Sequence, residues 1–231
     1  VLKTNHGELS IKAKKYHHLS KALRPLPEKY HGLSDIEERY RRRYVDLIMN
    51  EEARQVALTR PKIIRAIQNY LDDRGFVEVE TPVLQPILGG AAARPFQTYH
   101  NTLDMDFYLR IATELPLKRL IVGGLEKVYE IGRLFRNEGI STRHNPEFTT
   151  IELYEAYGSM YSMMEITEQL LQHLAITIRH STELEWNDKT ISLKAPFKRI
   201  HMCAIIQEVT GVDFFEPMDI EQAKKLADEH G

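Results

Sequence analysis

The residues best suited to chemistry lie in and beside one polar turn near the middle of the chain. Arg136, Arg143 and His144 could hold phosphate oxygens, because a guanidinium gives a fixed pair of donors that fits them. Phe148, just after the turn, could stack on a flat base, and Glu152 could hold a cation. Each residue alone is weak evidence, because a lone arginine on a strand is more often a surface ion pair and a lone phenylalanine more often core.

Two strand-like runs, at about 128–136 and 147–156, flank this turn and predict an antiparallel hairpin. Successive side chains of a strand point to opposite faces. One face of the second run is aromatic and polar, with Phe148, Thr150, Glu152 and Tyr154, whereas the other carries Ile151 and Leu153. A mixed-charge face is costly to bury unless something pairs with it. We therefore expect it to form the floor of a ligand site.

The elements before the hairpin predict a helix, a strand and a proline in that order. Residues 51–74 have the apolar spacing of a helix, interrupted by Pro61 and closed by Gly75. Because proline lacks an N–H and is best tolerated in a first turn, we expect one helix to end near Thr59 and a second to begin at Pro61. The next segment, GFVEVETPVL, predicts a strand that ends at Pro82.

A second junction between a strand and a helix lies further along. Alternating apolar residues predict a short strand up to Ile111, and Thr113 suits the N-cap of a helix that reaches about Val122. Glu114 then stands at this junction. The small residues of 88–94 predict a loop, which either moves over a ligand or simply connects two elements.

The segment FRNEGISTRHNPEFTTIELYEAY resembles motif 2 of the class II aminoacyl-tRNA synthetases. Its particular residues are similar to those of the bacterial lysyl-tRNA synthetases. The helix at 62–74 with GFVEVETPVL is similar to motif 1, and GGAAARPF and TELPLKRL match the segments between the motifs. The resemblance covers essentially the whole chain. It implies an α+β fold, in which an antiparallel sheet is flanked by helices and preceded by the last strand of an OB-fold β-barrel.

The resemblance gives the matching positions roles toward ATP. Arg136 would be the catalytic residue, holding the α-phosphate and the carboxylate of the amino acid. The other ATP-binding positions that it implies are Glu138 and Asn145 at the adenine end, Phe148 stacked on the adenine, and Arg143 with His144 near the outer phosphates.

The resemblance also implies how lysine is bound. Glu114 would receive the α-amino group with the Gly90 backbone nearby, and Glu152 and Tyr154 would receive the ε-ammonium. Pro82 would lie at the interface of a homodimer. The reaction implied is activation of L-lysine by ATP, with Mg²⁺, to lysyl-adenylate, followed by transfer to tRNA(Lys).

The expected domains follow from the same pattern. Residues 7–14 alternate with period 2, and one strand cannot form a domain, so we expect 1–20 to be the C-terminal remnant of an OB-fold anticodon-binding domain. Residues 21–33 contain prolines and predict a linker. Residues 34–231 are then the catalytic core with motifs 1 and 2 only.

The class also needs a third motif, a glycine-rich strand and helix with a second arginine, and acidic residues before it that hold Mg²⁺. After Gly158 the sequence has only Gly211 and Gly231, and only Arg179 and Arg199. We therefore expect an internal, inactive fragment with no metal ligands of its own, the family's ligands lying further toward the C-terminus. The tail predicts helices near 162–178, 201–210 and 219–230 and a hairpin at Asn187-Asp188.

Composition limits the class of protein. The 231 residues include 31 basic and 33 acidic side chains, for a net charge of −2, and 42% are apolar, as expected of a chain that buries a core. No run approaches the roughly 18 to 20 apolar residues of a membrane helix. A single cysteine, Cys203, excludes an internal disulfide. We expect a cytoplasmic protein with no membrane partner.

Two other interpretations remain open. One is the related ligase that attaches lysine to elongation factor P; it lacks the OB-fold domain, so the strand at 7–14 counts against it. The other is a non-catalytic, truncated paralogue that dimerises or binds RNA or a nucleotide. Only the absent third motif supports it, because loss of catalysis does not explain why Arg136, Glu114 and Glu152 are all present.

Overall fold

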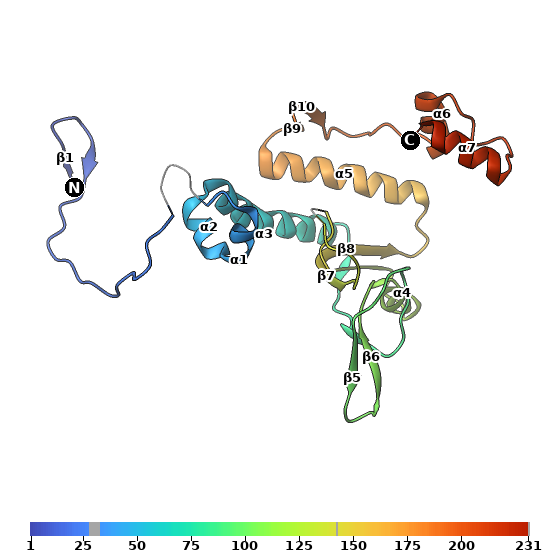
Figure 1. Ribbon diagram of the computed structural model, residues 1–231, viewed down its shortest axis with the longest axis horizontal. Helices are drawn as coiled ribbons and strands as arrows, with labels where there is room; N and C mark the ends of the chain where they lie inside the picture. The colour runs from blue at the N-terminus through green and yellow to red at the C-terminus, as the bar shows by residue number, and fades with distance from the viewer. Residues whose placement is uncertain (28–32, 142, 231) are drawn as a thin grey trace. The chain divides into compact units, whose positions relative to one another are not determined.

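The computed structural model describes residues 1–27, 33–141 and 143–230. The chain divides into two compact units, Val1–Pro61 and Lys62–Gly231, and each is described by itself. Helices, two small three-stranded sheets and one two-stranded sheet make up the second unit, so the expected α+β class is confirmed (Figure 1).

The first unit begins with a very short hairpin, β1 (Leu2–Lys3) and β2 (Leu9–Ser10), whose strands pair antiparallel. The half-buried strand predicted over 7–14 is wrong in its extent, since Leu9 and Ile11 are 76% and 83% exposed. An isolated two-stranded hairpin has no second layer to cover an apolar face, so alternation alone does not extend it. The predicted linker shows no helix or strand at 21–27, and its residues 28–32 lie outside the described residues.

Two short helices follow in the first unit, α1 (Ile36–Arg41) and α2 (Arg43–Met49). Asp35 caps α1 by accepting a hydrogen bond from the backbone N–H of Glu38 at 2.8 Å. The fully buried Asp46 of α2 accepts a hydrogen bond from Arg39 Nε at 2.8 Å. This carboxylate therefore ties the two helices together.

Helix α3 (Glu51–Asp72) runs without interruption through Pro61. The predicted break between Thr59 and Pro61 is therefore wrong. Proline removes one backbone hydrogen bond from a helix, but its fixed φ is compatible with helical backbone. The residues on both sides maintain the remaining hydrogen bonds of this 22-residue helix.

The central sheet of the second unit has the order β3-β7-β8. β3 (Val77–Glu78) is parallel to β7 (Lys127–Phe135), which pairs antiparallel with β8 (Glu147–Glu155) along its whole length. The predicted hairpin is thus confirmed. A second sheet, in the order β4-β6-β5, contains β4 (Leu84–Gln85), β5 (Gln97–His100) and β6 (Met105–Leu109).

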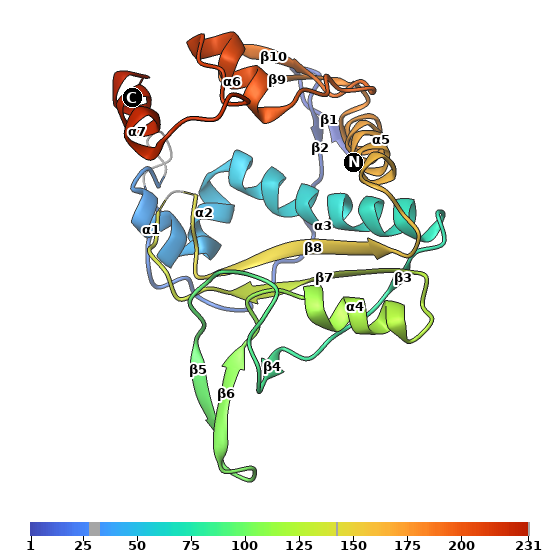
Figure 2. The same ribbon diagram turned by 90° about the vertical axis from the view of Figure 1, so that its right-hand side faces the viewer.

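The two faces of the β7–β8 hairpin have different neighbours. Tyr70 and Leu71 of α3 form a buried core with Phe76 and Tyr129. The apolar residues of the hairpin that pack against this core are Ile131, Ile151 and Leu153. The opposite face meets α4 (Glu114–Val122), and Figure 2 shows α3 and α4 on opposite sides of the hairpin. The apolar face predicted from period 2 is therefore confirmed.

The tail follows the predicted order. Helix α5 (Met160–Arg179) precedes a hairpin of β9 (Glu183–Trp186) and β10 (Lys189–Ser192), and helices α6 (Met202–Thr210) and α7 (Ile220–His230) follow. Asn187 and Asp188 have φ angles of 47° and 59°, which is typical of a tight two-residue hairpin turn.

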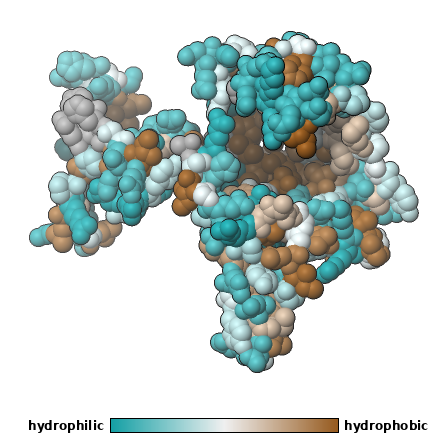
Figure 3. Space-filling model, turned by 45° about the vertical axis from the view of Figure 1, so that its right-hand side comes forward, coloured by the Kyte–Doolittle hydropathy of each residue, from teal (hydrophilic) through white to brown (hydrophobic). Residues whose placement is uncertain are grey.

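The surface is mixed in character, with hydrophobic side chains scattered among hydrophilic ones (Figure 3). Val122, at the end of α4, and Tyr157, just after β8, are examples of fully exposed apolar or aromatic side chains. No helix among the described residues is long and apolar enough to cross a membrane.

Candidate functional site

Arg136 and Phe148 lie together at the end of the β7–β8 hairpin that carries the turn. The guanidinium carbon of Arg136 is 5.3 Å from the centre of the Phe148 ring, a distance that allows cation–π attraction. Nε and Nη2 of Arg136 both donate to the carbonyl of Ile111 at 3.4 Å. A positive charge is thereby held beside an aromatic ring, as a nucleotide phosphate and its base require.

Among the described residues, Glu152 in the middle of β8 accepts hydrogen bonds from uncharged donors only. Its Oε1 accepts a hydrogen bond from the backbone N–H of Thr113 at 3.1 Å, and its Oε2 accepts one from the Tyr154 hydroxyl at 3.0 Å. Burial raises the pKa of Tyr154 well above its ordinary value, and the hydrogen bond to Glu152 raises it further. Tyr154 therefore remains a neutral donor, and the negative charge of Glu152 remains available for a cation.

Thr113 occupies the predicted N-cap position of α4, but its side chain does not cap the helix. Its φ and ψ are −104° and 1°, whereas a capping residue normally has an extended backbone. The hydroxyl is buried, and it has no hydrogen-bond partner among the described residues. The contribution of Thr113 to the site is instead its backbone N–H.

Glu114 and Gly90 come together at the first turn of α4. A Cβ atom at Gly90 would lie 3.1 Å from Glu114 Cβ and 3.0 Å from Ala112 Cβ, and Gly90 has a φ of +86°. Glu114 forms an ion pair with Lys118 at 2.6 Å, and the Lys118 ammonium lies 5.9 Å from the centre of the Tyr154 ring. An ammonium group is thus accommodated between this carboxylate and this ring.

The turn after β7 carries the remaining predicted ATP residues. Glu138 Oε1 accepts a hydrogen bond from the backbone N–H of Arg94 at 3.3 Å, which connects the turn to the 88–94 loop. Arg143 and His144 are exposed. The Asn145 side chain donates to a backbone carbonyl two residues further on at 2.6 Å. The turn therefore has hydrogen bonds of its own, while the Arg143 and His144 side chains face solvent.

Pro82 lies between β3 and β4, apart from the hydrogen bonds of the site. It is exposed, and its carbonyl accepts a hydrogen bond from Gln85 Nε2 at 3.3 Å. Its predicted place in a dimer interface stays a prediction.

Sequence reasoning missed the buried ion pair between Arg110 and Glu130, which lies next to the site. The signal was a charged residue in each of two apolar runs, YLRIA and VYEIG. A charge that interrupts an apolar strand pattern calls for a buried partner of opposite sign.

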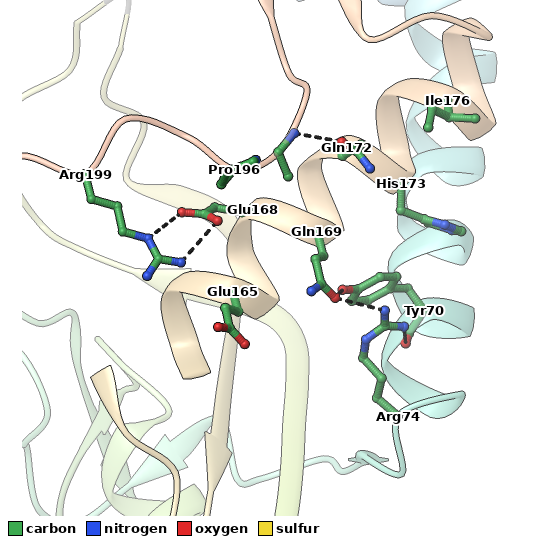
Figure 4. Close-up of a pocket in the computed structure, with 11 residues that line it drawn as sticks. Tyr70, Arg74, Glu165, Glu168, Gln169, Gln172, His173, Ile176, Pro196 and Arg199 are labelled. Atoms are coloured by element: carbon green, nitrogen blue, oxygen red, sulfur yellow. Dashed lines mark hydrogen bonds and ion pairs between the residues drawn. The ribbon is translucent and has the colours of Figure 1, made fainter. Parts of the chain in front are cut away.

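A separate pocket of about 710 Å³ lies among α3, α5 and residues 195–199 (Figure 4). None of the predicted ATP or lysine residues lines it. Its main polar feature is the ion pair of Glu168 with Arg199, at 2.8 Å and 3.2 Å. We interpret this pair as a structural connection between α5 and the segment after β10.

We predict that Glu168 makes stability sensitive to acid. Hydrogen bonds from Arg199 hold the pKa of Glu168 below its usual value of about 4.5. A carboxyl with a lowered folded-state pKa stabilises the fold above its unfolded-state pKa, and this contribution is lost as the pH falls through the folded-state pKa. Glu168→Gln should lower the free energy of unfolding at pH 7 and flatten its fall in acid, measured by denaturant unfolding at several pH values.

The matched control is Glu208→Gln, because Glu208 is 62% exposed and pairs with Lys198 at 3.5 Å. This exposed pair should leave the acid dependence close to that of the wild type. Equal acid dependence of wild type and Glu168→Gln would contradict the interpretation.

The mixed α+β fold agrees with the family that the sequence matches. The chain belongs to the tRNA synthetases class II (D, K and N), whose family model matches residues 35–225. It is 60% identical over 231 residues to the lysine–tRNA ligase of Lysinibacillus sphaericus (strain C3-41), covering all of this chain and 46% of that protein. It is 58% identical to the lysine–tRNA ligase of Staphylococcus aureus (strain Mu3 / ATCC 700698), covering 47% of that protein. The chain spans about half the length of the curated relatives it matches.

Proposed function

We propose that the whole protein containing this chain is a lysine–tRNA ligase, which activates L-lysine with ATP and transfers the lysyl group to tRNA(Lys). The observation that carries the proposal is the polar face of the hairpin. It places the Arg136–Phe148 pair at one end and the Glu152 carboxylate, with neutral donors only, further along the same strand. The high identity to ligases of this name supports the same conclusion.

In the proposed first step, the lysine carboxylate attacks the α-phosphorus of ATP and pyrophosphate leaves in line. Arg136 would hold the α-phosphate and the lysine carboxylate and stabilise the charge that develops on their oxygens. The adenine would stack on Phe148 beside Glu138 and Asn145, while Arg143 and His144 approach the outer phosphates. Positioning and electrostatics supply most of the rate enhancement in such a reaction.

Lysine would be selected by charge at two places. Glu152 and Tyr154 would receive the ε-ammonium, and Glu114, beside Gly90, would receive the α-amino group. The Lys118 ammonium already lies at Glu114 and near the Tyr154 ring, which supports an affinity of this region for amines. An uncharged amino acid would leave the Glu152 carboxylate unpaired, at a cost of about 1 to 3 kcal/mol.

In the second step, a terminal ribose hydroxyl of the tRNA attacks the lysyl carbonyl and AMP leaves. No three His, Cys, Asp or Glu side chains of the described residues lie together as a metal site. We propose that Mg²⁺ acts together with ATP in the first step and is held in the whole protein by acidic residues further toward the C-terminus.

The remaining proposals concern assembly. Residues 1–20 would belong to an OB-fold anticodon-binding domain, 21–33 to a linker and 34–231 to the catalytic core. Pro82 would lie at the interface of a homodimer. Charging of tRNA would place the protein in the cytoplasm.

The experiment that tests the proposed function is ATP–pyrophosphate exchange by the whole protein with lysine, aspartate and asparagine supplied separately. These are the amino acids of the family that the sequence matches. Exchange that depends on lysine alone is the expected result, because Glu152 attracts an ammonium and repels a carboxylate. Exchange with aspartate or asparagine in its place would contradict the proposal.

We predict that Gly90→Ala raises the KM for lysine several-fold. The new methyl group would press on Glu114 and Ala112, and the φ of +86° strains any side chain. The control is Gly124→Ala, because Gly124 has a φ of +99° but open space around its Cβ position. Equal effects of the two variants on the lysine KM would show that backbone strain alone is responsible.

A further inference from the structure

Two opposite charges lie inside the second unit, next to the lysine side of the proposed site. Arg110 and Glu130 are 3% and 4% exposed, and their side chains form an ion pair between Nη1 and Oε1. Taking both charges out of water is unfavourable, so a buried ion pair is by itself weak evidence of stability. Its position in the structure offers another explanation.

The pair is completed by neighbouring polar groups. Glu130 Oε2 accepts hydrogen bonds from the Thr81 hydroxyl at 2.7 Å and from the Thr81 backbone N–H at 3.2 Å. Arg110 donates from Nη1 to the Thr81 carbonyl at 3.0 Å and from Nε to the Arg133 carbonyl at 2.9 Å. The arrangement is therefore specific in geometry, and it connects three segments of the chain.

Because Gly132 has no side chain, the Arg110 guanidinium can occupy the space beside it. A Cβ atom at this position would lie 2.3 Å from Nη2 of Arg110 and 3.3 Å from Oε1 of Glu130. Any other residue at position 132 would therefore displace the Arg110 side chain.

Glu130 is also the register partner of Glu152 across the hairpin. Side chains directly opposite each other on antiparallel strands are close neighbours, and like charges there repel. Arg110 compensates the charge of Glu130, whereas Glu152 has only the neutral Thr113 N–H and Tyr154 hydroxyl. One carboxylate is thus neutralised and the other is left for a cation.

The same arginine fixes the segment that carries the lysine-binding groups. Its backbone N–H donates to the Val83 carbonyl at 2.9 Å, and its carbonyl accepts from the Phe135 N–H at 3.0 Å. The next residues of the segment supply the Ile111 carbonyl to Arg136 and the Thr113 N–H to Glu152. A shift of Arg110 would therefore move both contacts.

We propose that Arg110, Glu130 and Thr81 form a positioning network for lysine recognition: the network compensates Glu130, leaves Glu152 as the charge for the substrate ammonium, and holds residues 110–114 against the hairpin. This inference rests on the proposed function. None of the three is a catalytic residue, because each acts through Glu152 or the 110–114 segment.

The test is Glu130→Gln in the whole protein, with the KM values for lysine and ATP measured by pyrophosphate exchange after active-site titration. In this variant the positive charge of Arg110 is no longer compensated by Glu130. The Arg110 guanidinium then competes with the lysine ammonium for the negative charge of Glu152. The expected result is a rise of about tenfold in the lysine KM, with the ATP KM nearly unchanged. Glu130→Asp keeps the charge and should restore most of the lysine affinity.

A purely structural role would lower the melting temperature and the titrated active fraction but would leave the two KM values unchanged, which would overturn the inference. Glu168→Gln is the matched control, because it removes the charge from another carboxylate paired with an arginine, away from the site. It should lower stability without changing either KM.

If Glu130→Gln does not fold, the KM values for lysine and ATP are measured for Gly132→Ala instead. This variant keeps both charges and displaces only the Arg110 guanidinium. A selective rise in the lysine KM supports the inference, and unchanged KM values overturn it. Lysine-dependent exchange by the wild type separates the proposed function from the inference. If the wild type shows no such exchange, both are contradicted. If it does, but the variants have an unchanged lysine KM, the inference alone is contradicted.

Discussion

Replacement of Arg136 with alanine is expected to lower the rate of lysine-dependent ATP–pyrophosphate exchange by about 100- to 1,000-fold, the range observed when a transition-state charge donor is removed. Arg136 is held toward the proposed α-phosphate by its contacts with Phe148 and the Ile111 carbonyl. The loss should appear mainly in kcat, because the charge on the oxygens is largest in the transition state. Steady-state exchange kinetics on the purified whole protein measures it.

Arg133→Ala is the matched control for this prediction. Arg133 lies on β7, three residues before Arg136, but it is 56% exposed and pairs with Glu147 at 3.2 Å. Its loss should leave exchange nearly unchanged, since an exposed ion pair contributes little. A similar loss of rate in both variants would indicate a general effect of positive charge and would contradict the role given to Arg136.

Replacement of Glu152 with glutamine should raise the KM for lysine by about 10- to 100-fold and leave that for ATP almost unchanged. In the proposed function the carboxylate would provide the negative charge opposite the ε-ammonium, and glutamine keeps the shape without that charge. The amide oxygen can still accept a hydrogen bond from the Thr113 N–H, and the amide NH₂ can donate to the Tyr154 hydroxyl, so the local structure should persist. Exchange kinetics with lysine and ATP varied separately gives both values.

Glu147→Gln is the matched control. It also removes a negative charge from β8, but Glu147 is exposed and lies on the opposite face of the strand from Glu152. It should change neither KM. Equal rises in the lysine and ATP KM of Glu152→Gln would contradict the assignment of Glu152 to the lysine side chain.

The hairpin was predictable because two strand-like runs flank a polar turn that contains glycine, asparagine and proline. The face with Phe148 and Glu152 was therefore identified before the neighbouring elements were known. The contacts that complete the site, such as the Thr113 N–H on Glu152, join residues 39 positions apart. The sequence does not contain such distances directly, and only the resemblance placed Glu114 and Gly90 in the same site.

The incorrect predictions have local physical reasons. Alternation at 7–14 predicted a half-buried strand, but a hairpin of two-residue strands leaves Leu9 and Ile11 exposed. Pro61 predicted a helix boundary, but α3 accommodates the loss of one hydrogen bond. In each case a local rule was overridden by the surrounding structure.

The measurement that tests the central claim most directly compares L-lysine with L-norleucine, which has a lysine-like chain without the ε-ammonium, in ATP–pyrophosphate exchange by the wild-type whole protein. Because norleucine would leave the Glu152 carboxylate without a partner of opposite charge, lysine should be preferred by about 100-fold or more in kcat/KM. Glu152→Gln should abolish most of this preference for lysine over norleucine. Equal exchange with both amino acids, or a preference that Glu152→Gln leaves unchanged, would contradict lysine recognition by this face of the hairpin.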